Sequence, residues 1–226
     1  MVYFIHDMIE DYADQYDGEI QWKTASRKEF FELKGKTQEK KPDPGEFFSH
    51  QNLFLRYAIQ YDRIFNIHET GTGKTGSIIN LCEHYRVKEP GKIKRFIILQ
   101  PGPPTVEDFK DQIVKSKHTA VDDFYETDTV LNATDDKSLK NNLTRLINRN
   151  YEVTTYQKFF RDDVSEEKIE SYYSDCIFFF DEAHKLRNLS DNSGGKLNEL
   201  QLDRIYDYLW KITHTAKRCK VIISTA

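Results

Sequence analysis

Short apolar runs recur along the chain and alternate with stretches of helical character. The five runs cover residues 63–67, 95–99, 151–155, 176–180 and 221–224, and most of their apolar residues are Ile, Val and Phe. Runs of this length and composition predict strands that are buried on both faces, as in a parallel sheet covered by helices. We therefore predict an α/β fold with a mainly parallel sheet in the middle of three layers.

Helices are expected between these strands. The predicted helical ranges are around residues 48–57, 74–85, 106–115 and 200–213. A turn over residues 100–104, which holds three prolines, is expected to end the second strand. The polar range 121–143 is interpreted as an insertion or a mobile loop.

The first 45 residues differ from the rest of the chain. They are charged and aromatic, and one helix is expected over residues 26–33. Residues 40–45 contain two prolines and a glycine, which resist regular structure. We therefore predict an N-terminal extension of unknown role over residues 1–45 and a main domain over residues 46–226.

Composition narrows the class of protein only modestly. The chain has 226 residues, 31% of them charged, and a formal net charge of −4. This balance gives no overall basic field for nucleic acid, although a local groove can still be basic. Three widely spaced cysteines without a CxxC pair favour a reduced, intracellular protein. No run approaches the roughly 20 apolar residues that cross a bilayer, and the N-terminus lacks the plan of a signal peptide.

A glycine-rich segment between the first strand and the next helix has the pattern of a phosphate-binding loop. Its glycines let backbone N–H groups point at phosphate oxygens, and the following helix adds its positive end. The lysine is expected to reach the β- and γ-phosphates of ATP, and the threonine after it to bind Mg²⁺. The residues expected to bind the nucleotide here are Glu69, Thr70, Gly71, Thr72, Gly73, Lys74 and Thr75. His68 occupies the position where the general pattern has glycine, whereas the similar string at residues 35–37 has no strand before it.

Two carboxylates follow the fourth predicted strand. Asp181 is expected to hold Mg²⁺, and Glu182 to orient and deprotonate the attacking water. An acidic pair after a strand is often a solvated turn, but strand ends are also where open α/β sheets bind ligands. Together with Lys74, the pair predicts a P-loop NTPase with Lys74 and Glu182 as its catalytic residues.

Further motifs resemble those of superfamily-two helicases. The string at residues 181–184 is the DEAH form of their motif II, and residues 185–188 resemble its extension in Swi/Snf-type double-stranded DNA translocases. The resemblance implies a RecA-like first lobe in which His184, Ser224 and Thr225 couple hydrolysis to movement between lobes. It also places Thr154 and Thr155 along the nucleic-acid path.

Upstream residues are similar to virus-encoded members of this superfamily, such as poxvirus nucleoside triphosphatase I and the helicase-like subunit of poxvirus early transcription factor. The similarity lies in residues 49–51 together with the loop at 68–75. It implies that Gln51 reads the adenine edge.

The expected function is that of an ATP-binding first motor lobe of a helicase or DNA translocase, with duplex DNA as the favoured track. The second lobe is not encoded in this chain, so weak hydrolysis is expected. The resemblance further implies RNA polymerase or other transcription proteins as partners, in a host cytoplasm or a virion. The alternative is a nucleotide-gated protein-interaction module without translocation. A small-molecule kinase is disfavoured, because P-loop kinases rarely carry the DEAH form.

Overall fold

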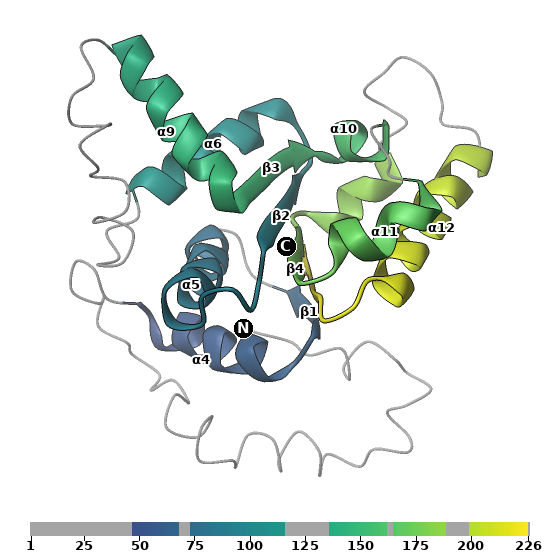
Figure 1. Cartoon of the computed structure of the whole chain (residues 1–226), viewed down its shortest axis with the longest axis horizontal. Coiled ribbons are helices and arrows are strands. Elements are labelled where there is room, and N and C mark those ends of the chain that lie inside the picture. Colours follow the sequence, from purple (N-terminus) through teal and green to yellow (C-terminus); the bar gives the residue numbers. More distant parts are fainter. Residues whose placement is uncertain (1–46, 68–72, 116–135, 162–164, 189–198, 226) are drawn as a thin grey trace.

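A five-stranded parallel sheet forms the centre of the molecule in the computed structural model (Figure 1). The structure describes residues 47–67, 73–115, 136–161, 165–188 and 199–225. The strands are β1 (Arg63–Ile67), β2 (Arg95–Gln100), β3 (Tyr151–Thr155), β4 (Cys176–Phe180) and β5 (Lys220–Thr225). Their order is β1-β5-β4-β2-β3, and every neighbouring pair is parallel. The predicted strands and the α/β architecture are confirmed.

Four helices pack on one face of the sheet. They are α4 (Ser49–Gln60), α5 (Lys74–Lys88), α6 (Pro103–Lys115) and α9 (Asp136–Asn150). Their apolar sides share one core with that face of the sheet, through residues such as Ile78, Phe109 and Phe179. The helix that follows the phosphate-binding loop, α5, is therefore held directly against the sheet (Figure 1).

Three helices pack on the opposite face. They are α10 (Tyr156–Arg161), α11 (Glu166–Tyr173) and α12 (Glu199–Thr215). A second core lies between them and the sheet and is rich in aromatic rings, including Phe159, Tyr173 and Phe178. A short 3-10 helix, η2 (Ala183–Asn188), follows β4.

Two expectations about the segments between strands were wrong. Residues 136–143 belong to α9 rather than to a loop, because Leu139, Leu143, Leu146 and Ile147 recur at helical spacing in an otherwise polar sequence. The turn after β2 is also shorter than expected, since α6 starts at Pro103. Proline is tolerated in a first helical turn, where its missing N–H would have no partner. The rest of the polar range, 121–135, and the expectations for residues 1–45 lie outside the described residues.

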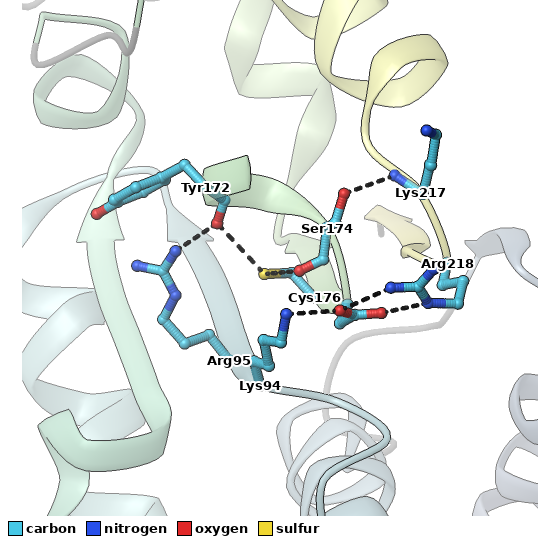
Figure 2. Close-up of polar contacts among 8 residues, drawn as sticks. Lys94, Arg95, Tyr172, Ser174, Cys176, Lys217 and Arg218 are labelled. Carbon is cyan, nitrogen blue, oxygen red and sulfur yellow. Dashed lines mark hydrogen bonds and ion pairs between the residues drawn. The ribbon is translucent and has the colours of Figure 1, made fainter. Parts of the chain in front are cut away.

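The amino-terminal edge of the sheet is fastened by a cluster around Asp175, part of which Figure 2 shows. The Asp175 carboxylate accepts hydrogen bonds from Arg218 Nε and a second guanidinium nitrogen at 2.6 and 3.0 Å, and Lys94 Nζ lies 2.8 Å away. Its backbone N–H donates to Lys217 O at 3.0 Å, and its carbonyl accepts from Lys94 N at 2.7 Å. The cluster ties the residues before β2, β4 and β5 together, at the edge opposite the functional site.

Candidate nucleotide-binding site

The end of the phosphate-binding loop lies at the carboxyl edge of the sheet, between β1 and α5. Gly73 precedes α5 with a left-handed φ of 80°, which glycine adopts without strain. Its carbonyl accepts hydrogen bonds from Gln51 Nε2 at 3.1 Å and from Ser77 N at 3.1 Å. This arrangement fixes the direction in which the chain enters α5 and presents Lys74 as the first residue of that helix.

Lys74 lies between the two predicted carboxylates. Its Nζ is 3.2 Å from Asp181 Oδ1 and forms a closer ion pair with Glu182 Oε1. The three charged groups come from α5 and from the turn after β4, more than a hundred residues apart in sequence. The structure therefore brings together the lysine and the acidic pair that the sequence predicted.

Burial and ion pairing shift the pKa values at this site in opposite directions. Burial lowers the pKa of Lys74, but the hydrogen bonds and charges of Glu182 and Asp181 outweigh it, so the net shift is upward. Burial raises the pKa of Glu182, but its hydrogen bond with Lys74 and the charges of Lys74, His184 and Lys185 together outweigh that effect, so the net shift is downward. Both groups are therefore charged at neutral pH.

The backbone around Asp181 is held from two sides. Asp181 N donates to Leu99 O at 3.0 Å, which extends the β2–β4 ladder by one residue. Its carbonyl accepts a hydrogen bond of 2.7 Å from the buried hydroxyl of Tyr156. Burial raises the pKa of Tyr156, which therefore stays a neutral donor. This positioning role of Tyr156 was missed in the sequence, where the only available signal was its place directly after the Thr154-Thr155 pair.

Glu182 itself has a left-handed backbone, with φ of 52°. Non-glycine residues adopt this conformation rarely, and such residues gather at functional sites. It turns the chain sharply after β4, so that both Asp181 and Glu182 can meet Lys74.

Two of the predicted coupling residues are in direct contact. His184 Nδ1 lies 2.7 Å from Thr225 Oγ1 and 3.4 Å from Glu182 Oε2. The imidazole thus links the acidic pair to the end of β5. The third coupling residue, Ser224, is fully buried beside them in β5.

Gln51 makes contacts within the protein in this conformation. Its side chain accepts a 3.0 Å hydrogen bond from Phe48 N in addition to its donation to Gly73 O, and it is 7% exposed. Its reading of adenine stays a prediction. Thr75 is half-buried in the first turn of α5. The predicted nucleotide contacts of residues 69–72 lie outside the described residues.

The two threonines of the predicted nucleic-acid path lie at the end of β3. Thr154 is 8% exposed, and its Oγ1 is buried without a hydrogen-bond partner among the described residues. Thr155 Oγ1 accepts a 3.2 Å hydrogen bond from Lys158 N at the start of α10. Contact between either residue and nucleic acid stays a prediction.

These residues fit a magnesium-bound nucleoside triphosphate. Asp181 Oδ1 is buried and has no well-aligned hydrogen bond from the described residues, so it can accept a hydrated cation. The backbone of Gly73, the start of α5 and Lys74 together suit a phosphate chain. Fold and site together define a RecA-like lobe of the P-loop ATPase class.

The comparison with protein families agrees with this class. The chain belongs to the family described as "Type III restriction enzyme, res subunit", whose model matches residues 31–224. This family consists of helicase-like ATPase domains, so the chain is a helicase-like lobe. The DEAH subtype stays a prediction, as does the similarity to poxvirus proteins.

Two viral proteins are similar in sequence. The chain is 24% identical to "Putative helicase 087L" of Invertebrate iridescent virus 3, over 100% of the chain and 23% of that protein. It is 26% identical to "Putative helicase 009L" of Frog virus 3, over 63% of the chain and 15% of that protein. The chain thus spans less than a quarter of the length of either relative. Among the described residues, no helix is both long enough and apolar enough to cross a membrane.

Proposed function

We propose that this chain is the ATP-binding first motor lobe of a nucleic-acid-dependent ATPase, a helicase or a double-stranded DNA translocase. One observation carries the proposal. Lys74, at the start of α5, is paired with Asp181 and Glu182 after β4, at the carboxyl edge of a parallel sheet. Membership in a helicase-like family supports the same conclusion.

In this proposal, Lys74 exchanges its ion pairs with the two carboxylates for ion pairs with the nucleotide. Its ammonium is shared between Asp181 and Glu182, and a triphosphate competes with these carboxylates for it. With Lys74 on the phosphates, Asp181 and Thr75 would be the residues that hold the cation. When bound, ATP supplies the phosphoryl group, and Mg²⁺ supplies positive charge that stabilises the transition state.

Glu182 orients water and accepts its proton once Lys74 has moved. The downward pKa shift of Glu182 depends on Lys74, so departure of the lysine raises the proton affinity of the carboxylate. General-base catalysis of this kind contributes about 10²–10⁴ in rate. The site would therefore acquire its base only after the nucleotide has bound.

The contact between His184 and Thr225 offers a route from hydrolysis to motion. His184 touches Glu182 on one side and the end of β5 on the other. We infer that a change at Glu182 reaches β5 through this imidazole, and from there a second lobe. Thr154 and Thr155 would then follow the track, for which duplex DNA is favoured.

The viral relatives motivate the wider setting. Both are described as helicases of viruses. We propose that the whole protein is viral, acts in the host cytoplasm or in a virion, and meets RNA polymerase or other transcription proteins as partners.

The test is ATP hydrolysis by the longest natural form of the protein. The rate is measured alone, with duplex DNA, with single-stranded DNA and with RNA, and Lys74→Ala serves as the negative control. Stimulation of at least tenfold by one nucleic acid, absent in Lys74→Ala, is the expected result. A rate that no nucleic acid changes would favour the nucleotide-gated interaction module instead.

A further inference from the structure

A layer of polar side chains crosses the sheet next to the nucleotide site. The register aligns five apolar residues, one from each strand, on the face that α5 covers: Ile64, Ile222, Phe179, Ile98 and Val153. Side chains alternate between the faces of a strand, so residues two positions further on share this face. These residues are Asn66, Ser224, Asp181, Gln100 and Thr155. The face thus changes from wholly apolar to wholly polar in one step.

Most of this polar layer is buried and carries atoms without partners. Asn66 is 1% exposed, Gln100 1% and Ser224 0%. Among the described residues, Asn66 Oδ1, Gln100 Nε2 and Ser224 Oγ have no hydrogen-bond partner, and Asp181 Oδ1 has only its ion pair of 3.2 Å with Lys74. Thr155 differs, because its hydroxyl caps α10.

Such a layer works against stability unless its atoms find partners. An unpaired polar group in a parallel sheet costs its full desolvation, and Val or Ile would pack better at the same positions. Native proteins leave few buried groups unsatisfied, and those few call for an explanation. Their position provides one: Gln100 is a direct neighbour of Asp181, a predicted metal ligand, and Asn66 is separated from Asp181 by Ser224.

The chemistry of the neighbours is complementary. Gln100 stands beside Asp181 on the β2 side, where its amide can donate towards a carboxylate. Ser224 stands on the β5 side, with Asn66 opposite it in β1 as an acceptor. Neighbouring strands are about 4.8 Å apart, and one water molecule can bridge side chains that do not meet directly.

We propose that Gln100 and Asn66 are positioning residues of the nucleotide site, which orient Asp181 and Ser224 through ordered water and thereby set the affinity for a hydrated divalent cation. The inference rests on the proposed function and deepens it. Side chains that contact a metal ligand, and not the metal itself, change the affinity for the metal by about 10–100-fold when they are removed. Neither residue touches the nucleotide in this scheme.

The test measures metal affinity rather than turnover. Mn²⁺ replaces Mg²⁺ and is titrated into the whole chain with a non-hydrolysable ATP analogue, and electron paramagnetic resonance reports the free ion. The variants are Gln100→Met and Asn66→Leu, which keep the approximate shape and remove the polar atoms. Tyr85→Phe is the matched control, because it removes a buried, unpaired hydroxyl from α5 outside the polar layer.

The expected result is a Kd for Mn²⁺ raised about tenfold or more in both layer variants. It should be unchanged in Tyr85→Phe, with the melting temperature of all three variants unchanged or higher. If Gln100→Met does not fold, Gln100→Asn carries the test, because it keeps the amide but withdraws it by about 1.5 Å. Folded layer variants with wild-type Mn²⁺ affinity would overturn the inference and leave the proposed function standing. If the wild-type chain binds no Mn²⁺ in the presence of the analogue, and so behaves like Lys74→Ala, both this inference and the proposed function are overturned.

Discussion

At the scale of single residues, Gly73 and Gln51 form a contact that leaves no room for a side chain at position 73. A Cβ there would lie 2.4 Å from Gln51 Nε2, and the φ of 80° is strained for any other residue. The amide can swing away, but it then loses its hydrogen bond to Gly73 O. The glycine is therefore required for both the backbone and the neighbouring side chain.

We predict that Gly73→Ala destabilises the chain by about 1–3 kcal/mol, from a left-handed alanine and a displaced amide. Urea unfolding measures the effect. Gly91→Ala is the matched control, since Gly91 has φ of 84° and open space around an added Cβ. In the wild type, Gly73→Ala should lower the free energy of unfolding more than Gly91→Ala does. In a Gln51→Ala background, the two substitutions should lower it by about the same amount. Equal costs in both backgrounds would argue against the Gln51 contact.

The ion pairs of Lys74 lead to a second prediction, which separates binding from chemistry. Lys74→Ala should weaken ATP binding about tenfold or more, because a charge-assisted contact to phosphate is lost. Glu182→Gln should bind ATP as well as the wild type or better, because Lys74 loses a competitor for the phosphates. Its hydrolysis should fall at least about 100-fold.

Equilibrium titration with a fluorescent ATP analogue and single-turnover hydrolysis measure the two effects. Hydrolysis at the wild-type rate in Glu182→Gln would rule out its role as the base. Lys185→Ala, in the same segment but exposed, controls for a general change of charge.

At the scale of elements, the Asp175 cluster holds the starts of three central strands in register. The carboxylate is buried and bound by Arg218 and Lys94, and these contacts lower its pKa from 3.8 to about 2. A carboxyl group whose pKa is lower in the folded state than in the unfolded state stabilises the fold at pH values above its unfolded-state pKa. This contribution is lost as the pH falls from about 4 towards 2.

We therefore predict that Asp175→Asn destabilises the chain by about 2 kcal/mol at pH 7, because it removes charge-assisted hydrogen bonds to a buried group. The difference between wild type and variant should shrink as the pH falls from 4 towards 2. Urea unfolding at several pH values measures it. Asp207→Asn, which removes an exposed partner of Lys211, should change stability little at any pH. A difference for Asp175→Asn that does not depend on pH would contradict the assigned cause.

Some secondary-structure elements and site residues could be predicted from the sequence, and others could not. Four strands were predictable because each is a short apolar run, and β3 because its residues are largely β-branched or aromatic. The acidic pair was predictable because it follows such an apolar run directly. Helix α9 was not, since its only apolar residues, Leu139, Leu143, Leu146 and Ile147, are spread through a polar sequence. Asn66 and Gln100 look like incidental polar residues in apolar runs. Only the register between strands places Gln100 beside Asp181 and Asn66 beside Ser224. The partnership of Asp175 with Arg218 likewise joins residues 43 positions apart.

At the scale of the whole molecule, Lys74 is the only lysine or arginine among the described residues that forms an ion pair with Asp181 or Glu182. In well-studied P-loop NTPases an arginine finger from a second element contributes about 10³–10⁵ in rate. The relatives are more than four times as long as the part that this chain matches, so such an element has room elsewhere in them. ATP binding and ATP hydrolysis should therefore differ in how strongly they depend on a second lobe.

We predict that this chain binds ATP within about tenfold of the affinity of a longer form that carries a second α/β lobe, because Lys74 and Asp181 already lie together. Its hydrolysis should be slower by about 10³-fold or more, because the transition-state charge lacks a second cation. Matched titrations and single-turnover rates of the two forms, each with its Lys74→Ala variant as background, measure both quantities. Equal rates would mean that the lobe is catalytically complete, and the coupling through His184 and Thr225 would then serve a purpose other than assembling the active site.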